Sequence, residues 1–175
     1  MLPETNVESP ENQTPRAPRL IAVNTSQGGI PRMPIGSGYV EKDGLRGDVR
    51  AHEKHRRTDR AISLLDYETV LQLRHEGFPV WPGRMGENLT VVGLGVQQLA
   101  PGTLLQIGEV VLQLEQPRKP CYVLDVIDPR LKNAVVGRCG YLASVIQPGM
   151  IESGARIQIC RQPCEGEFNE CRRRA

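Results

Sequence analysis

The sequence predicts a mainly β fold, a barrel or a sandwich with a few added helices. Short stretches of alternating apolar and polar residues recur along the chain, as in 110–115, where valine or leucine occupies every second position. Eighteen glycines and 14 prolines supply turns between these stretches, and aromatic residues make up only 4%. This combination is typical of short strands joined by tight turns, and a length of 175 residues fits one domain.

Two strands and one helix are predicted in the first half of the chain. Apolar residues indicate a strand at 20–25 and a short buried strand at 61–65. Asp66 is expected to cap a helix over 67–75 with its carboxylate, because a helix start leaves backbone N–H groups without partners. Gly77 is expected to end that helix, since glycine readily adopts the left-handed conformation that follows helix termini.

The second half is predicted to contain further strands and one short helix. The strands are expected at 89–92, 103–107, 110–115, 140–146 and 156–159. Gly108 and Glu109 suit the turn of a two-residue hairpin. Pro129 favours the start of a short helix that runs to Val135, and 122–126 fits either a short helix or an extended turn.

A proline-bounded segment carries the main functional candidate, Cys121. Pro117 and Pro120 lack an amide donor, so neither fits the interior of a central strand, and each favours extended backbone before it. The segment is therefore expected to form a stiff, exposed rim that presents the cysteine. Arg118 and Lys119 bring positive charge near the thiol, and cations favour the thiolate, the form that attacks electrophiles and binds soft metals. The alternative is a small buried cysteine with no chemical role.

A densely charged stretch at 48–60 is a second candidate binding site. Its candidate residues are Asp48, His52, Asp59 and Arg60. Arginine and lysine side chains in this stretch suit phosphate groups. Composition alone favours a solvated loop instead.

The third candidate site is the pair Glu87 and Asn88. The preceding Gly86 has no side chain, which lets the backbone approach a ligand closely. The two polar side chains could then orient polar groups of that ligand. A turn held by side-chain hydrogen bonds is the alternative.

These segments together resemble the signatures of the MOSC domain family, the C-terminal domain of molybdenum cofactor sulfurase. The similar segments are Gln116 to Cys121, Gly86 to Thr90, and Gly44 to Asp48 continued by Asp59 to Ala61. Their order and spacing resemble those of small bacterial members that consist of this domain alone. The resemblance implies a closed MOSC-type β-barrel with a few peripheral α-helices over 18–160. It would lie between a disordered, Pro-rich and Glu-rich tail at 1–17 and a polar tail with Cys and Arg at 161–175.

The chain departs from the family pattern at two places. Arg56, Arg57 and Thr58 stand where many small members have Gly-Gly-Pro. Arg32 stands where the family often has lysine, so the positive charge is retained. The first departure changes the shape expected for the loop before Asp59.

For function, the resemblance implies that the chain binds the molybdenum cofactor (molybdopterin), with Cys121 as the metal ligand and catalytic residue. The remaining candidates would surround this cofactor, with Arg60, Arg118 and Lys119 at its phosphate, Glu87 and Asn88 at the pterin edge, and Asp48, His52 and Asp59 on the same rim. Related proteins reduce N-hydroxylated small molecules. The electrons would come from a separate reductase, because the sequence contains no flavin or iron–sulfur motif.

Two alternatives stay open. In the first, the chain is a sulfur carrier, and Cys121 holds a persulfide delivered by a partner cysteine desulfurase that carries the pyridoxal phosphate. Larger family members fuse the two activities, which supports this possibility. In the second, the domain is a non-catalytic binding module and Cys121 is structural.

Composition argues against several other classes of protein. A net charge of +2 gives no basis for binding a nucleic acid polymer or a membrane surface. No apolar run approaches the ~20 residues of a transmembrane helix, and the N-terminal residues do not resemble a signal peptide. A cytoplasmic location with reduced thiols is therefore expected. Five cysteines, an odd number, argue against a complete disulfide framework, and Cys160, Cys164 and Cys171 are interpreted as incidental.

Overall fold

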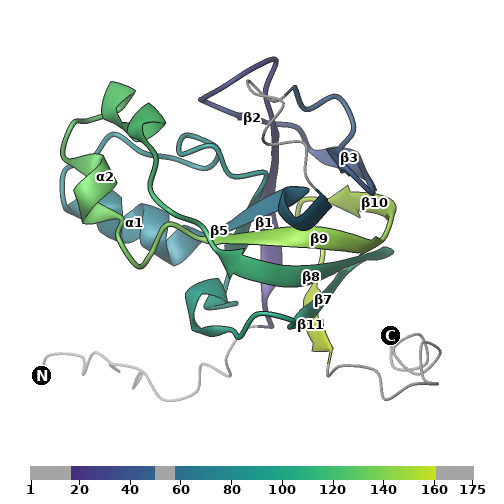
Figure 1. The fold of residues 1–175 in the computed structure, drawn as a ribbon. Helices are drawn as coiled ribbons and strands as arrows, with labels where there is room; N and C mark the ends of the chain where they lie inside the picture. The colour runs from purple at the N-terminus through teal and green to yellow at the C-terminus, as the bar shows by residue number, and fades with distance from the viewer. Residues whose placement is uncertain (1–16, 50–57, 161–175) are drawn as a thin grey trace, which may run out of the picture.

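The computed structural model describes residues 17–49 and 58–160, and its strands form two sheets with α1 and α2 gathered at one side (Figure 1). The strands are β1 (Arg19–Thr25), β2 (Met33–Pro34), β3 (Ser37–Glu41), β4 (Gly44–Leu45), β5 (Ile62–Asp66), β6 (Leu89–Val92), β7 (Leu104–Ile107), β8 (Val110–Pro117), β9 (Tyr141–Gln147), β10 (Gly149–Glu152) and β11 (Ile157–Cys160). The helices are η2 (Thr58–Arg60), α1 (Tyr67–His75), η3 (Val96–Gln98), η4 (Tyr122–Val126) and α2 (Leu131–Ala134), where η marks a 3₁₀ helix. The tails predicted at 1–17 and 161–175 lie almost entirely outside the described residues, as do His52, Cys164 and Cys171.

Eight strands form the main sheet, in the order β11-β7-β8-β9-β5-β6-β1-β2, and β10-β3-β4 form a smaller one. Neighbouring strands pair antiparallel except β5 and β6, which run parallel because α1 connects them as a crossover helix. The predicted hairpin between β7 and β8 is present, with Ile107 opposite Val110. The topology places β5, β8 and β9 side by side near the middle of the main sheet.

The predicted mainly β class is confirmed, whereas complete closure into a barrel is not. β11 and β2 stand at the two ends of the main sheet. The start of β1 meets the segment before β11, where Leu20 N–H donates to Ala155 O at 2.9 Å and Ile157 N–H donates to Pro18 O at 2.8 Å. Only an isolated bridge accompanies these bonds in the described residues, so the sheet edges approach without a continuous strand ladder.

Two buried clusters hold the elements together. The larger takes the inward face of β8, where Val110, Leu112 and Leu114 are fully buried and alternate with partly exposed neighbours, as the sequence predicted. The smaller packs α1 through Val70 and Leu73 against the helical side of the molecule. Full burial of each such side chain contributes roughly 1.5–3 kcal/mol, so the sheet is a firm frame for its loops. Among the described residues, none of the helices has the length and apolar character needed to cross a bilayer.

Three local predictions differ from the structure. Asp66 precedes α1, but its side chain makes no capping bond to that helix. Burial raises the pKa of its carboxyl, while the backbone N–H groups of residues 95–97 oppose that rise. β8 continues to Pro117, which pairs with Tyr141 of β9. Proline is tolerated there because the pairing of β7 with β8 ends at Gln113, so no strand on that side requires a backbone N–H from Pro117. The helix predicted at 129–135 is reduced to the four residues of α2.

The structure also decides what the sequence left open or did not reveal. Residues 122–126 form the 3₁₀ helix η4. β3, β4 and β10 were not predicted, because they are short and contain Gly38, Gly44 and Gly149 where a strand pattern needs side chains. These strands form the whole of the smaller sheet.

Candidate functional site

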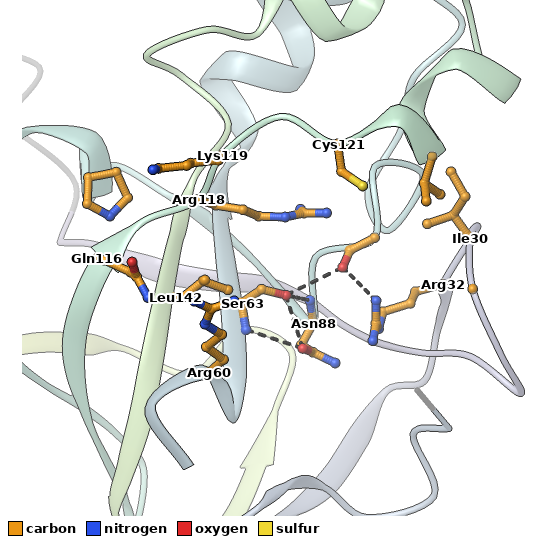
Figure 2. Close-up of a pocket in the computed structure, with 14 residues that line it drawn as sticks. Ile30, Arg32, Arg60, Ser63, Asn88, Gln116, Arg118, Lys119, Cys121 and Leu142 are labelled. Atoms are coloured by element: carbon orange, nitrogen blue, oxygen red, sulfur yellow. Dashed lines mark hydrogen bonds between the residues drawn. The ribbon is translucent and has the colours of Figure 1, made fainter. Parts of the chain in front are cut away.

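A cavity of about 340 Å³ lies beside β5, β8 and β9 (Figure 2). Its wall is formed by the loop after β1, by residues of η2 and β5, by the segment around Gly86, and by the segment from Gln116 to Val123. Four cationic side chains line it, namely Arg32, Arg60, Arg118 and Lys119. Candidate segments that are far apart in the sequence therefore meet at one site.

Cys121 lies at the cavity wall on the predicted rim. β8 ends at Pro117, and the next residue is anchored because Arg118 N–H donates to Gly140 O at 2.8 Å. Cys121 is the exposed N-cap residue of η4, and its carbonyl accepts the N–H of Leu124 at 3.0 Å. Both sides of the cysteine are thus fixed to the frame, and its side chain faces the cavity (Figure 2).

Asn88 lines the cavity, as expected, but its amide is engaged by the protein. Its Oδ1 accepts from the Ser63 backbone N–H at 3.2 Å and from Ser63 Oγ at 3.0 Å. Its Nδ2 donates to Asp48 Oδ2 at 3.1 Å. Ser63 was not among the predicted site residues, although a serine between Ile62 and Leu64 in a buried strand indicates a buried polar contact.

Asp48 stands behind the cavity wall and does not line it. Its side chain is 2% exposed, and its two oxygens accept from Arg32 Nε at 3.1 Å and Arg32 Nη2 at 2.8 Å. Arg32 Nη1 also donates to Gly86 O at 2.6 Å. Asp48 therefore orients Arg32, which does line the cavity. The one sequence signal for Arg32 was its positive charge at a position where the family often has lysine.

The other cations face different parts of the cavity. Arg118 and Lys119 point in opposite directions, as successive residues of an extended segment do, and Lys119 lies with Gln116 away from Cys121 (Figure 2). Arg118 Nη2 donates to Met85 O at 2.6 Å, and within residues 17–49 and 58–160 neither its buried Nη1 nor the buried Arg60 Nε has a hydrogen-bond acceptor. Asp59 is not part of the lining, and its carboxylate lies 4.0 Å from Arg60 Nε.

Glu87 does not reach the cavity, in contrast to the expectation that it would contact a ligand. It is fully buried, and its Oε1 accepts from the backbone N–H of Gly83 and from Thr90 Oγ1. The alternation of the segment explains this direction, because Gly86 and Asn88 line the cavity while the residue between them points inward. Glu87 thus fixes the loop from behind. Burial raises the pKa of its carboxyl above the ordinary value, although hydrogen bonds and Arg118 oppose that rise.

Replacing Glu87 with glutamine should reduce the dependence of stability on pH. The folded protein holds the Glu87 proton more tightly than the unfolded chain does. Its contribution to stability is therefore complete below the ordinary pKa of 4.5 and is lost as the pH rises through the raised pKa. Unfolding of Glu87→Gln, followed by denaturant titration at several pH values, should show a smaller loss of stability as the pH rises above 4.5 than the wild type shows. Glu152→Gln, on an exposed position of β10, is the control; an equal flattening there would contradict the assignment to Glu87.

Comparison with known proteins places this site in a family. The chain matches the MOSC domain over residues 51–158. It is 35% identical to protein YiiM of Escherichia coli strain K12 over 127 residues, which cover 66% of this chain and 56% of that protein. It is 27% identical to YflK of Bacillus subtilis strain 168 over 146 residues, covering 75% of this chain and 62% of that protein. The chain thus spans less than two thirds of the length of these two relatives.

A solved structure agrees with the sequence comparison. The crystal structure of YiiM from Geobacillus stearothermophilus superposes with a TM-score of 0.71 and 25% sequence identity, covering 85% of this chain and 77% of that one. The matched residues 51–158 include Arg60, the Gly86–Asn88 segment and the rim with Cys121. The chain belongs to the MOSC domain family.

Proposed function

We propose that the chain binds the molybdenum cofactor in this cavity, with Cys121 as the ligand to molybdenum. One observation carries the proposal: an exposed thiol adjoins a cavity lined by the cationic side chains of Arg32, Arg60, Arg118 and Lys119, and among the described residues the buried Arg118 Nη1 has no hydrogen-bond acceptor. Buried donors of this kind need an acceptor, and an anionic ligand would supply one. A thiolate is a suitable ligand for a soft metal centre.

The residues present fit such a cofactor in size and charge. A cavity of about 340 Å³ lies within the range of small-molecule sites. Arg60 and Lys119, at the side away from Cys121, would bind the phosphate (Figure 2). Asn88 would contribute through the ordered wall that it forms with Ser63, since its own amide is already hydrogen-bonded.

The proposed reaction is the reduction of an N-hydroxylated small molecule. When bound, the cofactor would supply two-electron redox chemistry at its metal. The protein would position the reacting centre through Cys121 and hold positive charge beside it through Arg118. Electrons would come from a separate reductase, and the exposed rim around Cys121 leaves the site accessible to such a partner.

The molybdenum content of purified protein tests this proposal. Protein from a host that makes the cofactor should contain nearly one molybdenum per chain, and Cys121→Ser should lose most of it because a hydroxyl is a poor ligand for a soft metal. Cys160→Ser, in β11, is the matched control and should keep its molybdenum. Wild-type protein without molybdenum, or equal retention in both variants, would refute the proposed ligand.

A sulfur carrier is the second candidate, and the exposure of Cys121 favours it. A thiol on a firm rim could receive a persulfide from a cysteine desulfurase, whose pyridoxal phosphate would stay on that partner. Intact-mass spectrometry after incubation with a desulfurase and cysteine should then show an adduct of about 32 Da that Cys121→Ser lacks. Metal-free protein that forms this adduct would favour the carrier over the cofactor-binding enzyme.

A further inference from the structure

The loop after β6 contacts the residue that anchors the cysteine rim. This loop contains the 3₁₀ helix η3, and the side-chain oxygen Oε1 of Gln97 in η3 accepts the backbone N–H of Gly140 at 3.0 Å. Gly140 is buried and immediately precedes β9. Gln97 does not line the cavity, so this contact lies outside the site described above.

Gly140 connects Gln97 to the rim, because both polar groups of its backbone are engaged. Its N–H donates to Gln97, and its C=O accepts the N–H of Arg118 at 2.8 Å. Arg118 is the first residue after β8, and Cys121 follows three residues later. Pro120 restricts the backbone between them by fixing one of its dihedral angles. A displacement of Gly140 is therefore passed along the rim with little slack.

Gln97 is itself held in a fixed place. The preceding residue, Val96, is fully buried in the larger core cluster. The carbonyl of Leu99, two residues further on, accepts the hydroxyl of Tyr141 at 3.1 Å. The loop is thus bonded to two successive residues, Gly140 and Tyr141. Residues 95–99 therefore form a brace for the anchor of the rim.

Loss of the Gln97 acceptor would move Gly140. A buried N–H group without an acceptor is unfavourable, so the backbone shifts toward another partner or toward water. On one side, the carbonyl of Leu64 closes the space in which a side chain of Gly140 would begin. The shift would therefore lead away from β5 and would displace the carbonyl that holds Arg118.

We propose that Gln97 is a positioning residue for Cys121, acting through Gly140 and the first residue of the rim. The side-chain oxygen of Gln97 fixes the place where the rim starts, although the side chain does not touch the cavity. The brace stands on these hydrogen bonds alone. Its consequence for a metal at Cys121 rests on the proposed function, in which the thiol must meet a bound group at a defined place.

Residue-resolved amide hydrogen exchange of the purified protein tests the brace. Gln97→Met replaces the amide oxygen with a thioether, which is a weak acceptor. It should accelerate exchange of the Arg118 and Leu124 N–H groups at least about fivefold. The Leu124 N–H reports on Cys121, because it donates to the carbonyl of that cysteine. Unchanged rates at both N–H groups would overturn the proposal.

Two further variants separate positioning from a general loss of stability. Gln97→Glu keeps an oxygen acceptor and should restore both exchange rates to within about threefold of the wild type. Gly154→Ala, between β10 and β11, adds a side chain at a φ of +90° with no atom within 4 Å, and so weakens the fold away from the rim. It should change both rates less than about threefold. Equal acceleration in Gly154→Ala, or no rescue by Gln97→Glu, would mean that Gln97 is only structural.

The molybdenum content of the same variants connects the brace to the proposed function. When protein from a host that makes the cofactor is dialysed, Gln97→Met should release molybdenum about tenfold faster than the wild type, because its metal ligand is less well oriented. Gln97→Glu should release it at the wild-type rate. Accelerated exchange with unchanged release would refute a role of Gln97 in orienting the ligand. Wild-type protein that never holds molybdenum would refute the proposed function, while the exchange rates would still decide whether the brace exists.

Discussion

Replacing Gly140 with alanine is expected to destabilise the protein by about 2–5 kcal/mol, because it adds backbone strain to a steric collision. Gly140 has a φ of +92°, in the left-handed region that side chains other than glycine rarely adopt. An added Cβ would also collide with the carbonyl oxygen of Leu64 and lie 3.4 Å from Leu65 Cα. These obstacles are backbone atoms of β5 in the middle of the sheet, so they cannot rotate away. Denaturant unfolding should show the loss as a lower midpoint.

Gly137→Ala separates the two causes. Gly137 has a φ of +77°, also left-handed, but an added Cβ there meets no atom within 4 Å. This variant should therefore lose only about 1–2 kcal/mol, the cost of the left-handed backbone. Equal losses in the two variants would contradict the collision with Leu64.

The Gly140→Ala substitution should also affect the candidate site. Gly140 O accepts the N–H of Arg118, so a shift of the backbone at Gly140 should loosen the rim that presents Cys121.

Removal of the Asp48 carboxylate by alanine is expected to cost about 3–5 kcal/mol, because it leaves a largely buried guanidinium without its counter-charge. The side chains of Arg32 and Asp48 are only 13% and 2% exposed. Asp48 also accepts the N–H of Ser26 at 2.9 Å and a hydrogen bond from Asn88, so several donors lose their acceptor together. Equilibrium unfolding in urea measures the loss.

An exposed arginine–carboxylate pair supplies the control for Asp48. Glu41 and Arg46 form an ion pair at 2.7 Å with side chains that are 41% and 63% exposed. Glu41→Ala should cost less than about 1 kcal/mol, because water replaces the lost partner. A loss in Asp48→Ala no larger than in Glu41→Ala would mean that the buried pair does not hold the cavity wall.

Local patterns predicted the strands and the rim well, because their causes lie within a few residues. The inward face of β8 follows from the two-residue period of Val110, Leu112 and Leu114. The presentation of Cys121 follows from two prolines that restrict the backbone on either side of Arg118 and Lys119. The smaller sheet has no such signal: β3 pairs with the distant β10, and its neighbour β4 is only two residues long.

Side-chain direction at the site was the weakest prediction. Glu87 and Asn88 are neighbours with similar polarity and are both buried, yet only Asn88 lines the cavity. In an extended segment, neighbouring side chains point to opposite sides of the backbone. The sequence does not specify which of the two sides faces the ligand. The same uncertainty grouped Arg118 with Lys119, whose side chains point apart (Figure 2).

By itself the sequence determined a mainly β domain, the order of its central elements, and a family signature that identifies Cys121 as the reactive candidate. Only the tertiary structure decided that Asp48 and Glu87 support the cavity from behind while Arg32 enters its wall. The physical reason is that a side chain's role depends on which charges and carbonyls surround it. At this site those partners come from loops that are 16 to 54 residues apart along the chain.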